Sequence, residues 1–412
     1  MLEQLGKQAK AAAGVLSCAP RALKDAALLA AADALLSQTA DILEANALDL
    51  ENGRQSGMSE ALLDRLRLDE KRIAGMAQGM RDVAASADPV GRVLWGETRP
   101  NGLQIRKISV PLGVIAVIYE ARPNVTADAA ALCLKAGNAV ILRGGKEAIR
   151  SNAAVADCMR EAIAAAGLPR DCIQLVQDTS RESARALMTL NGYVDVLIPR
   201  GGAGLIRAAV ENATVPVIET GTGNCHVYVD KDADLDMAAN IVYNAKVSRP
   251  SVCNACESLL IHRAVADQAV PLLCGRLREA NVEIRGDETV CRLVPDAVPA
   301  TVEDYAKEFL DYIISVKVVD SLDEAVRHIA QNGTGHSECI VTENYAAAQT
   351  FLARVDAAAV YVNASTRFTD GGEFGFGAEI GISTQKLHAR GPLGLANLTA
   401  EKYIILGSGQ IR

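Results

Sequence analysis

The sequence predicts an α/β fold with two domains, and three observations lead to this prediction. The chain has 412 residues, more than a single hydrophobic core usually contains. Half of the residues are apolar and 22% are charged, which is typical of a globular protein. From Pro111 onward, short apolar runs alternate with helical stretches. This alternation is typical of parallel sheets with crossover helices.

The N-terminal part differs from the rest. Residues 2–87 are predicted to form helices only, since apolar residues recur at helical spacing, most clearly in Ala26–Leu43. Residues 98–110 carry charge throughout and predict a strand or hairpin arm outside the core. The terminal segment EKYIILGSGQIR (401–412) predicts a lone strand. Because a lone strand needs a partner, we expect pairing with the 98–110 arm, within one chain or between subunits.

Two sets of alternating elements follow the arm. The first has expected strands at Gly113–Tyr119, Ala139–Leu142, Ile173–Val176, Val194–Ile198 and Val215–Ile218, and helices at Thr126–Lys135, Ile149–Ala166, Ser180–Leu190 and Leu205–Glu211. The second has expected strands at Ser258–His262, Val282–Arg285, Ile314–Val319, Glu338–Thr342 and Ala359–Asn363, and helices at Leu235–Ala245, Val265–Glu279, Leu322–Gln331 and Tyr345–Arg354. The two sets predict two parallel sheets.

Composition argues against several classes of protein. The net charge of −8 and the lack of a basic tract argue against nucleic acid as a partner. The longest apolar run, Val110–Tyr119, is about half the length of a membrane helix. The first residues carry charges and do not resemble a signal peptide. Ten scattered cysteines then favour reduced thiols, so we expect a cytoplasmic protein without a membrane partner.

The segment KVSRPSVCNACESLLIH (246–262) contains the first candidate for chemistry, Cys253. It predicts a loop between a helix and a strand, with Lys246 and Arg249 close by in sequence. Cationic neighbours lower the pKa of a thiol and favour the nucleophilic thiolate. The alternative interpretation is a buried structural cysteine, because free cysteines often serve only as small apolar side chains.

Cys253 and Cys256 also form a Cys-x-x-Cys pair, which could be a redox motif or half of a metal site. A zinc site needs about four ligands. The sequence has no second pair of this kind, and its five histidines are dispersed. A thioredoxin-type motif opens a helix, whereas here a strand is expected to follow. We therefore expect no metal and no redox pair.

Two polar residues stand where a strand is expected to end. Glu219 precedes a turn with two glycines in IETGTGNCHVYVD (218–230), and Asn124 lies in YEARPNVTADAA (119–130). Both places are typical of active-site residues. Glu219 could equally be a solvated turn carboxylate. Asn124 could donate to an oxyanion or could simply cap the helix that follows.

Two glycine-rich turns join a strand to a helix and carry a cation. They are LRGGKEA (142–148), with Gly144, Gly145 and Lys146, and IPRGGAGL (198–205), with Arg200, Gly201 and Gly202. Such junctions expose backbone N–H groups that bind phosphate. Neither turn is Gly-x-Gly-x-x-Gly or a P-loop, and each could be only a tight connection. Two of them in one sheet favour a dinucleotide cofactor.

A long loop at residues 363–392 combines glycine, arginine and aromatic residues. Long loops in compact domains are usually functional. Arg367 and Arg390 are candidates for carboxylate or phosphate recognition, with ordinary surface arginines as the alternative.

Taken together, these segments resemble the aldehyde dehydrogenase superfamily, and within it the branch that reduces γ-glutamyl phosphate. The resemblance covers essentially the whole chain and rests on YEARPNVT, ETGTGNCHVYVD, RPSVCN, SECIVT, YVNASTRFTDGGEFGFGAE and STQKLHARGPLGL. It implies a Rossmann-type dinucleotide-binding domain (1–97 and 111–219), a second α/β catalytic domain (220–390) and a small β oligomerisation arm (98–110 and 391–412).

The resemblance also implies roles for individual residues. Cys253 takes the position of the nucleophile, Asn124 that of the oxyanion donor, and Lys146 that of a contact to the cofactor's ribose or phosphate. Glu219 precedes Cys253 by 34 residues, close to the spacing of thirty-odd residues between the corresponding glutamate and the catalytic cysteine of the superfamily. The usual turn is Glu-Leu-Gly-Gly, whereas here it is Glu-Thr-Gly-Thr. An acyl phosphate reductase must not hydrolyse its thioester, so the role of Glu219 as a general base stays open.

The implied activity is the NADPH-dependent reduction of L-γ-glutamyl 5-phosphate to L-glutamate 5-semialdehyde, with release of phosphate through a Cys253 thioester. This is the second step of proline biosynthesis from glutamate. The expected substrate-binding cations are Lys246, Arg249, Arg367 and Arg390. The expected partners are glutamate 5-kinase, as supplier of the substrate, and further copies of the chain in a dimer or tetramer. Two alternatives remain, an aldehyde dehydrogenase that acylates coenzyme A and a non-enzymatic member of the fold.

Overall fold

A computed structural model describes residues 2–412, with the side chains of all of these except Ala61 and Ala203. The chain forms two compact units. The first contains the chain up to Thr220, Gly375–Gly381 and Leu393–Arg412, and the second contains Gly221–Phe374 and Ile382–Pro392. Gly375–Gly381 thus clusters with the first unit, although it lies inside the range 220–390 that we assigned to one domain. Backbone hydrogen bonds from Ile380 to Leu393 and from Leu393 to Gly381 bind it there.

Five helices begin the first unit, as the sequence predicts. They are α1 (Leu2–Leu16), α2 (Arg21–Ser37), α3 (Thr39–Gln55), α4 (Glu60–Leu66) and α5 (Glu70–Ala85). Two of them start at residues whose side chains accept a backbone N–H, Ser59 for α4 and Asp69 for α5. No single helix in 2–412 is long and apolar enough to cross a membrane, although α2 and α3, bent by 67° at their junction, pass together by length and composition.

The first unit is built around a four-stranded parallel sheet in the order β5-β4-β3-β6. Its elements are β3 (Val114–Tyr119), α6 (Asn124–Lys135), β4 (Ala139–Arg143), α7 (Ile149–Ala165), β5 (Ile173–Leu175), α8 (Arg181–Met188), β6 (Val196–Arg200) and α9 (Ala203–Asn212). The chain runs outward from β3 to β5 and then returns to place β6 on the other side of β3. Ligands of open α/β sheets bind beside the carboxyl ends of strands at such a switch point.

The predicted strand Val215–Ile218 is wrong as a full strand. Only one bridge forms there, between Val217 and Leu197. Pro216 has no N–H to donate and contributes only its carbonyl, which accepts from the Leu197 N–H at 2.8 Å. A ladder therefore cannot continue through this segment.

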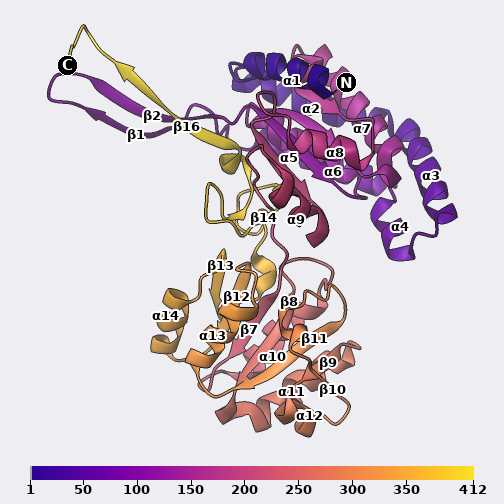
Figure 1. Ribbon diagram of the computed structural model, residues 1–412, viewed down its shortest axis with the longest axis vertical. Helices are drawn as coiled ribbons and strands as arrows, with labels where there is room; N and C mark the ends of the chain where they lie inside the picture. The colour runs from indigo at the N-terminus through magenta and orange to yellow at the C-terminus, as the bar shows by residue number, and fades with distance from the viewer. Residues whose placement is uncertain (1) are drawn as a thin grey trace. The chain divides into compact units, whose positions relative to one another are not determined.

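The second unit contains a seven-stranded parallel sheet in the order β10-β9-β11-β8-β7-β12-β13 (Figure 1). The strands are β7 (Cys225–Val229), β8 (Cys256–His262), β9 (Glu283–Gly286), β10 (Val298–Pro299), β11 (Ile313–Val319), β12 (Ser337–Val341) and β13 (Ala359–Val362). The helices are α10 (Leu235–Val247), α11 (Ala266–Glu279), α12 (Glu288–Leu293), α13 (Leu322–Asn332) and α14 (Tyr345–Arg354). The sequence prediction missed β7, β10 and α12.

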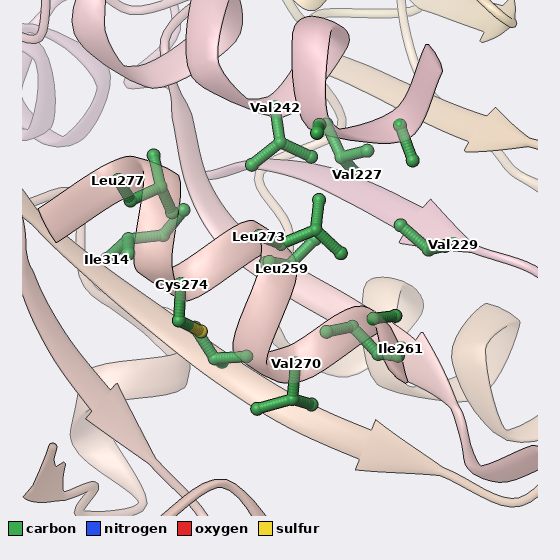
Figure 2. Close-up of a cluster of buried hydrophobic side chains, with 14 of the residues drawn as sticks. Val227, Val229, Val242, Leu259, Ile261, Val270, Leu273, Cys274, Leu277 and Ile314 are labelled. Atoms are coloured by element: carbon green, nitrogen blue, oxygen red, sulfur yellow. The ribbon is translucent and has the colours of Figure 1, made fainter. Parts of the chain in front are cut away.

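A hydrophobic core holds α10 and α11 against this sheet. Figure 2 shows Val242 of α10 and Leu273 of α11 pointing toward Val227 and Leu259 of the sheet. All four side chains are buried. Cys274 lies in the same core, so this thiol serves as a small apolar side chain, as the sequence predicts for most of the cysteines.

An antiparallel arm belongs to the first unit. It consists of β1 (Val93–Thr98), β2 (Gln104–Pro111) and β16 (Thr399–Leu406) in the order β1-β2-β16. The predicted pairing of the terminal strand with the 98–110 arm is therefore confirmed within one chain, from Thr399 opposite Pro111 to Leu406 opposite Gln104. The remaining short elements are β14 (Ile382–Ser383), β15 (Gly391–Pro392) and the 3₁₀ turns at Lys146–Ala148, Arg170–Cys172, Arg263–Val265, Glu303–Ala306, Thr366–Phe368 and Leu395–Leu398.

Candidate active site

Cys253 lies in a turn between α10 and β8 and is half-buried. The next residue, Asn254, fixes this turn to a distant segment. Its side chain donates to the carbonyl of Thr369 at 2.9 Å, and its own carbonyl accepts from the Thr366 hydroxyl at 2.7 Å. The loop 363–392 thus holds the Cys253 turn in place through buried hydrogen bonds.

The turn before β7 packs against the backbone carbonyl of Cys253. A Cβ at Gly223 would overlap the carbonyl oxygen of Cys253, so only glycine fits at this position. The Cys225 thiol donates to the same carbonyl at 3.1 Å. Burial raises the pKa of Cys225 well above its ordinary value, so this side chain stays a neutral donor. The Gly223 N–H is held in turn by Glu308, whose Oε1 accepts it at 2.8 Å.

Arg367 brings a positive charge to the Cys253 turn. Its guanidinium donates to the amide oxygen of Asn254 and, at 3.2 Å, to the hydroxyl of Ser248. Both of these partners are neutral, and the charge of the nearby Asp370 carboxylate acts on the guanidinium as well. Burial and the neighbouring charge of Arg249 lower the pKa of Arg367, while Asp370 and, to a smaller extent, Cys253 oppose this effect. Arg249, Arg367 and Cys253 therefore lie within electrostatic reach of one another.

Lys246, which the sequence suggests as a substrate ligand, is placed differently. It is fully buried and forms an ion pair with Glu257 of β8, also fully buried. Burial raises the pKa of Glu257 to about 7, while Lys246 acts to lower it. A lysine without exposed surface, bound to an internal carboxylate, has nothing to offer a substrate. We therefore remove Lys246 from the substrate contacts.

Arg390 forms an ion pair with a carboxylate of the chain, that of Asp356. Its Nη1 donates to Asp356 at 2.8 Å, and Asp356 also pairs with Lys386. Its Nη2 lies beside Gly335, since a Cβ on that glycine would be 3.9 Å away. Arg390 thus lies near the amino end of β12, and its substrate role stays a proposal.

The Cys-x-x-Cys pair is divided between two environments. Cys256 begins β8, and its burial raises its pKa to about 12, whereas Cys253 is half-buried in the preceding turn. Within 2–412, no group of three or more histidine, cysteine, aspartate or glutamate side chains could hold a metal ion.

In the first unit, two of the predicted residues, Asn124 and Arg200, lie at the switch point of the sheet between β3 and β6. Asn124 is the first residue of α6, directly after β3, and it is exposed. It does not cap the helix, because Pro123 occupies that position. Its Nδ2 instead donates to Asp128 Oδ2 at 3.0 Å. Arg200 ends the neighbouring strand β6, opposite Tyr119 of β3.

The glycines of the two predicted cofactor turns differ in the space around them. Cβ atoms at Gly144 and Gly145 would overlap the side chains of Asn152 and Glu147. A Cβ at Gly201 would be 2.7 Å from the carboxyl carbon of Glu120. Space around Gly202 is open, and its N–H donates to Glu120 Oε2 at 3.1 Å. Lys146 is exposed at the start of its 3₁₀ turn.

Glu219 is partly buried and directly precedes Thr220, whose hydroxyl donates to the Pro199 carbonyl at 2.7 Å. Asn124, Lys146, Arg200 and Glu219 therefore belong to the first unit, and Cys253 belongs to the second.

Sequence reasoning missed three residues that contact these sites, namely Asp128, Cys225 and Glu308. Asp128 stands four residues after Asn124, a helical spacing that could have predicted the contact. Cys225 and Glu308 offer no such sign, because the residues they contact are distant in sequence.

Comparison with known proteins agrees with this geometry. Residues 3–295 match the model of the aldehyde dehydrogenase family. The chain is 63% identical over 404 residues to gamma-glutamyl phosphate reductase of Clostridium novyi, covering 98% of this chain and 97% of that protein. It is 62% identical over 407 residues to the enzyme of the same name from Moorella thermoacetica, covering 99% and 97%.

Among solved structures, gamma-glutamyl phosphate reductase from Thermotoga maritima matches with a TM-score of 0.98 and 47% identity, over 100% of this chain and 99% of that one. An acetylating aldehyde dehydrogenase from Geobacillus thermoglucosidasius shares the fold at a TM-score of 0.69 and 18% identity, over 100% and 97%. The chain therefore belongs to the aldehyde dehydrogenase family and, within it, to the gamma-glutamyl phosphate reductases.

Proposed function

We propose that the chain catalyses the NADPH-dependent reduction of L-γ-glutamyl 5-phosphate to L-glutamate 5-semialdehyde and phosphate, the second step of proline biosynthesis from glutamate. The observation that carries this proposal is the identity of 63% over nearly the full length to a gamma-glutamyl phosphate reductase. The half-buried Cys253, in a turn anchored by buried hydrogen bonds and with Arg249 and Arg367 near it, supports the proposed chemistry.

In the proposed mechanism, the Cys253 thiolate attacks the acyl carbonyl and phosphate departs, leaving a thioester on Cys253. The Asn124 amide and the Cys253 backbone N–H donate to the oxyanion that forms during this attack. Covalent attachment divides one difficult reaction into two easier ones. NADPH, when bound, supplies the hydride that reduces the thioester. The thiohemiacetal on Cys253 then releases the aldehyde and restores the thiolate.

The residues at the switch point suit a dinucleotide. The N–H of Gly202 already donates to a carboxylate oxygen, that of Glu120, at the start of α9. A phosphate oxygen is a chemically similar acceptor, and helix N-termini favour it. We propose that Gly201, Gly202 and Arg200 bind one part of the cofactor. Lys146, exposed after Gly144 and Gly145, would bind its ribose or phosphate.

The cations near Cys253 suit the leaving group. Arg249 and Arg367 lie close enough to interact electrostatically, and the Arg367 guanidinium donates to the neutral side chains of Asn254 and Ser248. A planar guanidinium binds phosphate oxygens in pairs. We therefore propose that Arg249 and Arg367 bind the phosphoryl group. Arg390, near the amino end of β12, is proposed for the α-carboxylate.

Glu219 has a smaller proposed role than its position in the family implies. Reduction of an acyl phosphate needs no water activated for hydrolysis. We expect Glu219→Gln to keep at least about a tenth of the wild-type kcat, since one removed general base typically costs 10²–10⁴-fold. Steady-state kinetics measure this, and a loss of about a hundredfold or more would make Glu219 a catalytic base.

We propose that the enzyme works in the cytoplasm as a homo-oligomer, a dimer or tetramer, and that glutamate 5-kinase supplies its unstable acyl phosphate. Exposed apolar side chains on the β1-β2-β16 arm, including Trp95, Tyr403 and Ile405, support self-association.

The central test is a spectrophotometric assay of NADP⁺ reduction with glutamate 5-semialdehyde and phosphate. The wild type should show activity that depends on phosphate, and Cys253→Ala should lower it about a thousandfold or more. Cys18→Ala is the matched control, because Cys18 is an exposed thiol in the first unit. Full activity of Cys253→Ala would exclude the thioester. Activity that requires coenzyme A in place of phosphate would favour the acylating alternative.

A further inference from the structure

Asp128 is the residue that touches the proposed oxyanion donor. Its Oδ2 accepts a hydrogen bond from Asn124 Nδ2 at 3.0 Å, one helical turn away on α6. Among residues 2–412, Asp128 is the hydrogen-bond partner of the Asn124 side chain. The orientation of this amide therefore depends on Asp128.

The chemistry of the partner decides which end of the amide faces it. A carboxylate accepts hydrogen bonds and donates none, so it binds the NH₂ group and repels the amide oxygen. An amide NH₂ has two hydrogens, and Asp128 uses only one of them. The second remains for another acceptor. If the amide rotated by half a turn, it would present an oxygen where a donor is needed.

We propose that Asp128 is a positioning residue, which holds the Asn124 amide so that its second N–H is available to the oxyanion. This inference rests on the proposed function, because it requires that Asn124 act as the oxyanion donor. Asp128 itself touches neither substrate nor cofactor in this proposal. It acts by removing the wrong orientation of Asn124 before the reaction begins, as preorganised donors do.

The surroundings of Asp128 make its effect on the orientation of the Asn124 amide depend on pH. Burial raises the pKa of Asp128 to about 6, while the Asn124 hydrogen bond and the charge of Arg200 act to lower it. The carboxyl is thus ionised at neutral pH and protonated as the pH falls through about 6. Once protonated, it carries a donor and no longer excludes the rotated amide.

Few other charges bear on this group. Arg200 approaches from β6, and α5 presents Gly79, where a Cβ would lie 4.0 Å from Asp128 Oδ1. The buried lysines toward the other end of α6 have partners of their own. Lys135 pairs with Asp25, and Lys24 pairs with Asp88.

The test measures kcat and KM in the phosphate-dependent oxidation of glutamate 5-semialdehyde between pH 5 and 8. Asp128→Ala should lower kcat at pH 7.5 by about 10–100-fold, less than the full loss of an oxyanion donor, with KM for semialdehyde little changed. Asp128→Asn keeps the size of the side chain but does not titrate. It should therefore lack the decline of kcat that the wild type shows below about pH 6.

A double-mutant cycle separates positioning from a structural effect. If Asp128 acts through Asn124, then Asp128→Ala should have little further effect on kcat in an Asn124→Ala background. Asp157→Asn, which removes an exposed carboxylate of α7, is the control and should match the wild type.

Three results would overturn the proposal, given an active wild type. They are an unchanged kcat in Asp128→Ala, an equal loss in the Asn124→Ala background, and a persistent acid decline in Asp128→Asn. A wild type without any phosphate-dependent activity would instead reject the proposed function itself.

Discussion

At the scale of single residues, Gly223 shows how the Cys253 turn is kept in place. The carbonyl of Cys253 packs onto the Cα of Gly223 and also accepts from the Cys225 thiol at 3.1 Å. These contacts fix the backbone of Cys253, the proposed nucleophile, at its carbonyl group. The position demands glycine because of space, since its φ is not among the positive values of the chain.

We predict that Gly223→Ala displaces the Cys253 turn. Overpacking against a fixed backbone should lower the free energy of unfolding by about 1–3 kcal/mol and slow the labelling of Cys253 by iodoacetamide. Denaturant titration and mass-spectrometric labelling measure both effects. Gly275→Ala is the control, because a Cβ at this helical glycine meets nothing within 4 Å. That variant should be neutral or more stable by up to about 1 kcal/mol. Equal behaviour of the two variants would refute the steric argument.

At the scale of elements, a buried ion pair joins α10 to β8. Lys246 and Glu257 have side chains that are fully buried, and Glu257 also accepts from the Leu310 N–H at 3.1 Å. The pair connects the last turn of the helix to the strand that follows the Cys253 loop. Removal of one partner leaves an uncompensated charge in the interior.

We predict that Lys246→Met lowers the free energy of unfolding by about 3–5 kcal/mol. The double variant Lys246→Met/Glu257→Gln should recover most of this loss, because glutamine is neutral and still accepts from Leu310. Arg263→Met, which breaks the exposed pair with Asp320, should cost at most about 1 kcal/mol. Urea titrations compare the three variants. A Lys246→Met variant as stable as Arg263→Met would show that the buried pair contributes little.

At the scale of the whole molecule, one face of the arm combines side chains suited to an interface. Trp95 of β1 and Tyr403 of β16 both lie opposite Lys107 of β2, so the three form one row on the same face. Ile405 follows two residues after Tyr403 and lies opposite Ile105. Trp95, Tyr403 and Ile405 are 45%, 58% and 59% exposed, respectively.

We predict that Ile405→Lys weakens self-association. Sedimentation of the wild type should show a dimer or tetramer, and the variant should shift toward the 43.4 kDa monomer, because a charge opposes burial of this face. Val302→Lys is the control, since Val302 is 80% exposed in the second unit. A monomeric wild type at micromolar concentration would exclude the proposed oligomer. A variant that associates as the wild type does would place the interface elsewhere.

Much of the fold was predictable because its signals are local. The apolar runs at Val114–Tyr119 and Ile313–Val319 and the helical spacing of Leu322–Asn332 reveal strands and helices directly. The strand β7 was missed because it follows a glycine turn and its second residue, His226, is polar. His226 is tolerated there because Glu338 of β12 accepts its ring N–H and its backbone N–H. That partner lies 112 residues away.

The residues of the candidate site were also only partly predictable, because their contacts depend on partners distant in sequence. Arg367 is predicted as a functional arginine, but its hydrogen bond to Asn254 beside Cys253 depends on the folding of a long loop. Lys246 is predicted wrongly, because the sequence gives no sign that α10 turns it toward Glu257. From sequence alone, a lysine is expected to be exposed, because the carboxylate that would allow its burial cannot be identified.

By itself, the sequence determined the alternation of strands and helices, the family resemblance and the candidate nucleophile, because each depends on residues close together in the chain. Only the tertiary structure decided the order of the strands, and with it the switch point where Asn124 follows β3 and Arg200 ends the neighbouring strand β6. It also decided that Lys246 is buried and that Gly223 supports Cys253. The physical reason is that strand order, burial and close backbone contact are set by partners distant in sequence.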